Sequence, residues 1–191
     1  MKPWSLGGTP PRRSRSCEPV KRPVIADLPE GLALRPASEA DRAVLLAVYA
    51  GTREDELAYT DWSADQKLAF VTAQFEAQDQ HYRLHYPGAQ FLVVEAQGKP
   101  VGRLYLHYRP TEIRLMDISL LPAARGSGIG GQLLARVLEE GRRTGRRVTI
   151  HVEKMNRARR LYERLGFTVI SDVGVYDLLE WRSDPGPGSV V

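Results

Sequence analysis

A glycine-rich stretch between an expected strand and an expected helix constrains this chain more than any other feature. It runs over 120–131 and reads Leu-Leu-Pro-Ala-Ala-Arg-Gly-Ser-Gly-Ile-Gly-Gly. Small residues there expose backbone N–H groups, and the positive end of the following helix points into the same space. A side chain at Gly126, Gly128 or Gly130 would hold phosphates off the backbone or block a positive φ. The loop therefore predicts a phosphate-binding site, to which Arg125 can add a charge-assisted contact.

The segments around this loop alternate as in a mixed sheet with helices packed on it. Hydrophobic periodicity and turn signals predict about seven strands, at 32–35, 90–96, 101–108, 112–121, 148–152, 167–170 and 175–181. About four helices are expected, beginning after Ser38, after Ser63, at Ile129 and at Asn156. Short turns make the middle strands an antiparallel meander, and strands and helices alternate after it. The predicted class is α+β, with a mixed and mostly antiparallel sheet.

Composition divides the chain into one domain with two tails. Residues 1–30 are rich in Pro, Gly, Ser and Arg, and their six basic against three acidic side chains supply most of the net charge of +4. We expect a disordered arm over 1–30, a folded domain over 31–182 and a flexible tail over 183–191. The nearly neutral domain argues against nucleic-acid binding. No apolar run approaches the ~18 residues of a membrane helix, and the first residues lack a secretory signal. A cytoplasmic protein that binds no membrane is therefore expected.

The same glycines also fit the dinucleotide-binding fingerprint. Gly126, Gly128 and Gly131 match Gly-x-Gly-x-x-Gly, and Glu153 follows about 20 residues later. Three features weaken this interpretation. The loop follows a meander instead of opening the fold, four residues separate the strand from the first glycine, and too few strand–helix units follow. A dinucleotide-binding oxidoreductase is therefore a minor alternative.

A second motif lies one strand and one helix beyond the loop: Asn156-x-Ala158-x-x-Leu161-Tyr162-x-x-x-Gly166-Phe167. Together with Pro122 and Arg125-Gly126-x-Gly128-x-Gly130, this run resembles the GNAT superfamily of acyl-CoA-dependent N-acetyltransferases. The resemblance covers about residues 31–181 and is sharpest over 112–167. It implies a GNAT-like fold, acetyl-CoA as co-substrate, and acetyl transfer to a primary amine on a small molecule or peptide. No metal is implied.

The resemblance also implies roles for individual residues. The glycine loop would bind the pyrophosphate of CoA, and the strand before it would pair its backbone with the pantetheine arm. Asn156 would contact the cofactor, and Tyr162 would protonate the leaving thiolate. The expected cofactor-binding residues are Ile118, Ser119, Leu120, Arg125, Gly126, Ser127, Gly128, Ile129, Gly130, Asn156 and Arg159.

The catalytic base has two candidates, Glu112 and Asp117. Amide formation needs a neutral amine, so some group must accept the proton of an ammonium whose pKa is near ~10. The sequence does not decide between the two carboxylates. We favour Glu112, because the amino end of its strand, beside a splayed sheet, would leave room for a water chain to the amine. Structural roles are the alternatives: Glu112 as a solvated turn residue, Asp117 as a local acceptor, Tyr162 as a core aromatic and Asn156 as a helix cap.

Two further clusters have plain explanations. His81 and His85 lie one helical turn apart, but no third ligand is near in sequence, so a metal site is not expected. Four arginines surround Gly145, where cations suit the end of a helix. Contact with the 3′-phosphate of CoA is the alternative for these arginines, which are Arg142, Arg143, Arg146 and Arg147.

The expected reaction is direct attack of the amine on acetyl-CoA in a ternary complex. The single cysteine, Cys17, lies in the expected arm with no base partner, so it is no credible acyl carrier. The main alternative is a CoA-binding regulatory module that has lost catalysis, and the presence of Tyr162 and both carboxylates speaks against it. The sequence is also compatible with a homodimer.

Overall fold

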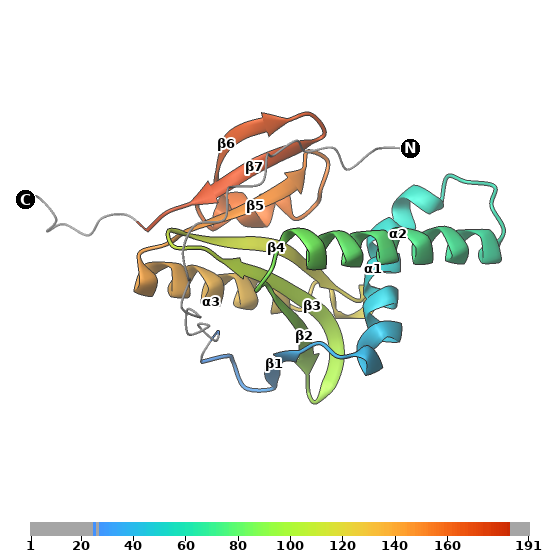
Figure 1. Cartoon of the computed structure of the whole chain (residues 1–191), viewed down its shortest axis with the longest axis horizontal. Coiled ribbons are helices and arrows are strands. Elements are labelled where there is room, and N and C mark those ends of the chain that lie inside the picture. The colour runs from blue at the N-terminus through green and yellow to red at the C-terminus, as the bar shows by residue number, and fades with distance from the viewer. Residues whose placement is uncertain (1–24, 26, 184–191) are drawn as a thin grey trace, which may run out of the picture.

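The computed structural model describes residue 25 and residues 27–183 (Figure 1). The strands are β1 Leu32–Pro36, β2 Gln90–Ala96, β3 Lys99–Tyr108, β4 Glu112–Leu120, β5 Arg147–Glu153, β6 Thr168–Val173 and β7 Tyr176–Trp181. The helices are α1 Arg42–Leu57, α2 Ala64–His85, α3 Ile129–Thr144 and α4 Arg159–Arg164. Short 3-10 turns, Glu39–Asp41 and Pro122–Ala124, precede α1 and the glycine loop.

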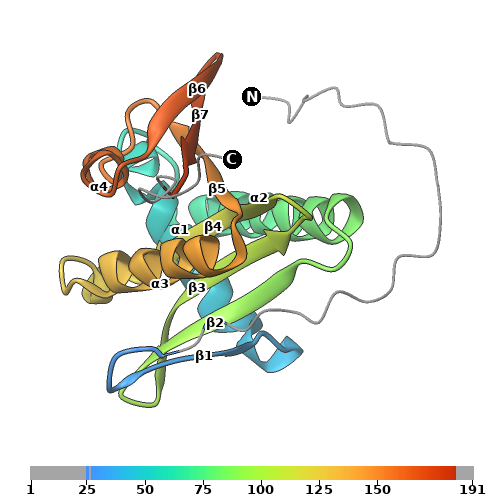
Figure 2. The ribbon, with the colours of Figure 1, turned by 90° about the vertical axis from the view of Figure 1, so that its left-hand side faces the viewer.

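One seven-stranded sheet with the order β1-β2-β3-β4-β5-β7-β6 organises the described chain. All neighbouring strands run antiparallel except β4 and β5, which are parallel. Helix α3 covers one face of the sheet, while α1 and α2 lie on the other (Figures 1 and 2). The predicted α+β fold with a mixed, mostly antiparallel sheet is confirmed.

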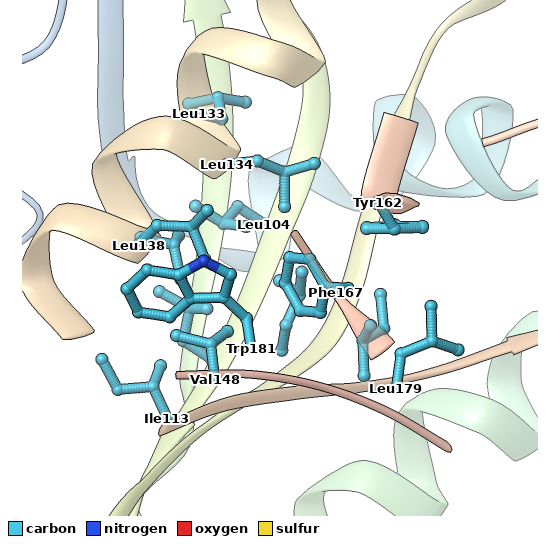
Figure 3. Close-up of a cluster of buried hydrophobic side chains, with 14 of the residues drawn as sticks. Leu104, Ile113, Leu133, Leu134, Leu138, Val148, Tyr162, Phe167, Leu179 and Trp181 are labelled. Atoms are coloured by element: carbon cyan, nitrogen blue, oxygen red, sulfur yellow. The ribbon is translucent and has the colours of Figure 1, made fainter. Parts of the chain in front are cut away.

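Two hydrophobic clusters hold the helices on the sheet. The larger one joins α3 and α4 to β3, β4, β5 and β7, and the smaller one joins α1 and α2 to β2. Figure 3 shows the larger cluster, in which Trp181 and Phe167 lie among the leucines of α3. This burial follows from the helical spacing of the apolar residues along α3: Ile129, Leu133, Leu134, Val137 and Leu138.

Local sequence signals set most of the element boundaries. Ser63 and Gln66 form the expected capping box, in which the Ser63 side chain accepts from the Gln66 N–H and the Gln66 side chain accepts from the Ser63 N–H. At the other expected cap the chain first makes a 3-10 turn, because Asp41 accepts hydrogen bonds from both the N–H and the hydroxyl of Ser38. Helix α3 ends at Gly145, whose φ of 63° suits a residue without a side chain.

Packing against the core begins before the expected start of the domain. Ile25 is only 5% exposed and belongs to the larger cluster, and Leu28 packs against it. Both residues lie in the segment that composition assigned to the arm. Residues 1–24 and 26 of the expected arm, and residues 184–191 of the expected tail, lie outside the described residues.

Candidate active site

The parallel strands β4 and β5 separate partway along their length. They pair from Glu112 opposite Arg147 to Leu115 opposite Ile150, and within the described chain no pairing continues beyond. β4 goes on to Leu120 with β3 on its other side. The edge of β4 that faces β5 is therefore left without a strand partner over 116–120. An extended ligand can pair with such an edge, as expected for Ile118, Ser119 and Leu120.

A β-bulge marks the point at which the two strands part. Tyr105 on β3 is opposite Asp117, whereas Leu106 is opposite Leu115, so Met116 is the extra residue. The hydroxyl of Tyr82 on α2 donates to the Met116 carbonyl at 3.3 Å. Tyr82 is buried, and this burial raises the pKa of its phenol. Helix α2 thus holds the bulge from one face of the sheet.

The glycine loop lies at the start of α3, as expected. Gly126 and Gly128 have φ of 74° and 86°, in the region that favours glycine. A Cβ at Gly126 or Gly130 would meet no atom within 4 Å, so open space borders the loop. The first N–H groups of α3 have no intrahelical partner because the helix begins here. Loop and helix end together have the exposed N–H groups and the positive helix end that the predicted phosphate site requires.

Helix α1 packs directly against the segment that leads into this loop. A Cβ at Gly51 would come within 2.9 Å of Arg125 Nη2 and 3.0 Å of Pro122 Cδ. The Arg125 guanidinium also donates from Nε to the Leu120 carbonyl at 3.1 Å. Gly51 was not singled out from the sequence, although a glycine inside a helical pattern signals close packing.

Tyr162 lies in the larger hydrophobic cluster, beside Phe167 (Figure 3). Tyr162 is 4% exposed, and its ring packs edge to face against that of Phe167, with 5.5 Å between the ring centroids. Burial, followed by the charge of Asp117, raises the pKa of the phenol above its ordinary value. Tyr162 therefore keeps its proton at neutral pH, which a proton donor requires. The charge of Asp117 thus acts on the phenol of Tyr162, the other predicted catalytic residue.

Asp117 is held by a buried arginine that the sequence analysis missed. Arg103 on β3, 1% exposed, donates from Nε and Nη2 to the two carboxylate oxygens of Asp117, at 3.2 and 2.7 Å. The Ser119 hydroxyl donates to Oδ1 at 2.7 Å, and Gln78 on α2 accepts from Arg103 at 2.8 Å. An arginine inside an apolar strand is a signal that could have revealed this pair, because buried cations need partners.

We call the space beside the unpaired edge of β4 over 116–120 the opening between β4 and β5. Glu112 lies away from it, in the part of β4 that is paired with β5. Its carboxylate accepts hydrogen bonds from Thr149 and Arg109, and Arg147 lies 3.7 Å away. Burial tends to raise the pKa of Glu112, but the Thr149 hydrogen bond and the nearby arginines outweigh burial and lower it. Our reason for favouring this residue was a splayed sheet beside it, and the structure places the splay at the other end of the paired segment. From Glu112 to Met116, where the two strands part, is four residues, or roughly 13 Å along β4.

A buried polar network separates Glu112 from the opening. Arg114 donates to the Thr149 hydroxyl at 3.1 Å and also contacts Nδ1 of His151. His151 is the first residue of β5 past the last β4–β5 pair. Because a guanidinium only donates, Nδ1 of His151 accepts, and the neutral ring carries its proton on Nε2. Burial and the charge of Arg114 lower the pKa of His151 to about 4.

Asn156 and Arg159 both take structural partners. The Asn156 side chain accepts from the Ala158 N–H at 2.8 Å, so it caps the turn that leads into α4. This turn is why α4 begins later than expected. Arg159 donates to Asp177 on β7 at 2.5 Å and to Glu163 at 3.1 Å. Those two bonds occupy Nε and Nη1 of a residue that was expected to bind the cofactor.

The remaining clusters lie apart from the opening. The rings of His81 and His85 on α2 are 4.4 Å apart. Among the described residues, no group of three or more His, Cys, Asp or Glu side chains could hold a metal ion. The arginines around Gly145 lie at the carboxyl end of α3, and the glycine loop lies at its amino end, roughly 24 Å away. Within the described ranges, no helix has the length and apolar character needed to span a bilayer.

Comparison with known sequences identifies the family. The acetyltransferase (GNAT) family matches residues 55–167, which is more than half of the chain. The chain therefore belongs to this family of acetyltransferases. The matched segment contains β4, the glycine loop and the motif on α4.

Solved structures of other proteins share the fold. A PaiA N-acetyltransferase from Thermoplasma acidophilum, solved in complex with coenzyme A, is 18% identical with a TM-score of 0.62, over 80% of this chain and 99% of that one. An acetyltransferase from Thermus thermophilus is 20% identical with a TM-score of 0.59, over 80% and 97%. RimL, a ribosomal L7/L12 alpha-N-protein acetyltransferase solved with coenzyme A, is 19% identical with a TM-score of 0.57, over 83% and 97%.

Proposed function

We propose that this protein transfers the acetyl group of acetyl-CoA to a primary amine by direct attack in a ternary complex. The observation that carries the proposal is the edge of β4 over 116–120, which does not pair with β5, includes Asp117 and leads into the glycine loop. Membership of the acetyltransferase family supports the reaction class. The acceptor is an amine on a small molecule or a peptide.

The cofactor would lie along the free edge of β4. Its pantetheine arm would pair with the backbone of Ile118 to Leu120, and its pyrophosphate would sit on the N–H groups over 125–130. The positive φ of Gly126 and Gly128 and the open space around the loop support this placement. Arg125, held against Leu120 and α1, would add a positive charge beside the pyrophosphate.

Two residues would move protons in the reaction. Tyr162 would donate its proton to the CoA thiolate as the thioester breaks, and its raised pKa keeps that proton in place beforehand. Asp117 would accept the proton of the acceptor ammonium, directly or through a water molecule. We prefer Asp117 to Glu112, because Asp117 lies on the part of β4 that does not pair with β5, whereas Glu112 lies in the paired part.

The acceptor can be found by incubating the protein and acetyl-CoA with pools of metabolites and peptides and reading the products by mass spectrometry. Acetylated amines that form in step with CoA release would support the proposal. The matched control is Tyr162→Phe, which keeps the ring but lacks the proton. Acetyl-CoA binding without any acetylated product would instead indicate a CoA-binding module that has lost catalysis.

A further inference from the structure

A hollow lined by arginines lies at the end of the molecule opposite the glycine loop. It has a volume of about 360 Å³ and is lined by Thr111, Gly145, Arg146, Arg147, Arg182 and Ser183. The elements that carry its lining residues, the carboxyl end of α3 and the end of β7, lie on the left-hand side of Figure 1. We call it the arginine pocket. Its size falls in the range of small-ligand sites.

The positive charge of this pocket exceeds the negative charge that faces it. Glu180 is shared by two of the arginines, accepting from Arg147 at 3.0 Å and from Arg182 at 2.5 Å. Arg146 donates from Nε to the carbonyl oxygen of Arg109 at 2.9 Å, and no carboxylate among the described residues pairs with it. Glu112, 3.7 Å from Arg147, is already bound by Arg109. The pocket therefore holds guanidinium N–H donors that its own carboxylates do not use.

One of the arginines that line the pocket has a buried donor, Nε of Arg147. Within the described part of the chain, this atom is inaccessible to solvent and makes no hydrogen bond. A buried polar group without a partner is rare, and a bound ion or water is one of the usual reasons. The described residues thus leave one donor without an acceptor on an arginine that lines the pocket.

The helix dipole does not explain why Arg146, Arg147 and Arg182 gather in the pocket. Arg142 and Arg143 lie in the last turn of α3, where they complement its negative end, and each is paired with a glutamate one turn earlier. Arg146 and Arg147 come after the helix cap, and Arg182 follows β7. Because a helix carboxyl end repels anions, any affinity for an anion must come from the guanidiniums themselves.

We propose that Arg146, Arg147 and Arg182 form a binding site for the phosphate group of a small ligand, separate from the cofactor site. Guanidinium groups match the oxygens of phosphate through paired N–H donors, and their charge is kept at any physiological pH. Helix α3, roughly 24 Å long, separates the pocket from the glycine loop. The phosphates of one CoA molecule therefore cannot occupy both sites.

The test is titration of inorganic phosphate into the full-length protein at constant ionic strength, with chloride as the control anion. Saturating coenzyme A is present throughout, so that the glycine loop is filled. Calorimetry and the melting temperature should both show saturable phosphate binding. A parallel titration with glycerol phosphate distinguishes a phosphorylated metabolite from the free anion, and binding of either supports the site.

Matched variants then locate the binding. Arg146→Gln and Arg182→Gln should each weaken phosphate binding about tenfold or more, because each removes a charge-assisted contact. Arg143→Gln lies at the same helix end, outside the pocket, and should leave phosphate affinity unchanged. A phosphate response no larger than that of chloride would overturn the proposal, as would equal affinities in all three variants. Neither result depends on whether the protein transfers acetyl groups.

Discussion

Arg103 holds Asp117 through two hydrogen bonds, from Nε to Oδ1 at 3.2 Å and from Nη2 to Oδ2 at 2.7 Å. The guanidinium also lies over the rings of Tyr49 and Tyr105, with centroids at 5.6 and 5.1 Å. The pair joins β3 to β4 just beyond the bulge at Met116. The orientation of the proposed base is therefore fixed by a residue that touches neither substrate in our proposal.

Replacing Arg103 with methionine should damage both stability and turnover. The variant leaves Asp117, only 12% exposed, without its charge partner, which typically costs about 3–5 kcal/mol in a buried pair. Denaturant unfolding measures the loss, and steady-state kinetics should show a lower kcat. Arg103→Lys keeps the charge but cannot form both hydrogen bonds, so its stability and kcat should lie between those of the wild type and Arg103→Met. Wild-type stability and kcat in Arg103→Met would show that the pair has no role in either.

Cofactor binding should depend on the glycines of the loop at 126–130 and not on positive-φ glycines elsewhere in the chain. Acetyl-CoA should raise the melting temperature of the wild-type protein by mass action. Gly128→Ala should reduce or abolish that shift, because φ at this position is 86° and the loop must stay close to the phosphates. Gly98→Ala is the matched control, since Gly98 also has a positive φ, 71°, but lies in the β2–β3 turn. An undiminished shift in Gly128→Ala would contradict the loop assignment.

Matched pH–rate profiles should choose between the two carboxylates. If a carboxylate takes the proton of the amine, turnover rises with pH through an apparent pKa set by that group and its neighbours. Asp117→Asn should flatten this limb or move it toward the pKa of the amine. Glu112→Gln should keep the limb and lose stability, because Thr149 and two arginines lose a charged partner. The opposite pattern would return the role of base to Glu112.

His151 should stay neutral well below its ordinary titration range. Its pKa falls from 6.5 to about 4 on folding, so the unfolded chain binds the proton more readily. This contribution to stability is intact above pH 6.5 and is lost as the pH falls toward 4. Ring signals in NMR should therefore not titrate between about pH 7 and 5, and His151→Gln should reduce the slope of stability against pH in that window. A midpoint near 6.5 would contradict the buried Arg114 contact.

Local patterns were sufficient to predict most of the fold. The capping box at Ser63 and the helical stripe of α3 depend on residues three or four apart, so one sequence carries them in full. Strand β2 has the predicted bounds, because turn residues flank it on both sides. The glycine loop could likewise be predicted locally, because the residues that allow its backbone conformation are consecutive in the sequence.

Long-range register could not be predicted in the same way. The point where β4 and β5 part depends on a bulge at Met116 and on pairing between strands that are separated by all of α3. No local signal places the opening at one end of β4 rather than the other, and our preference for Glu112 rested on the wrong end. Ile25 was missed for a related reason, because a lone apolar residue in a polar segment has no periodicity.

The central claim is that Tyr162 donates a proton to the CoA thiolate in an acetyl transfer to an amine. Amine-dependent release of CoA from acetyl-CoA, measured side by side for the wild-type protein and Tyr162→Phe, tests it most directly. The phenylalanine keeps the ring that packs edge to face on Phe167 and removes the hydroxyl group that carries the proton. We predict a loss of turnover of about ten- to a thousandfold, with acetyl-CoA affinity within a few fold of wild type. Full turnover in Tyr162→Phe would contradict the account.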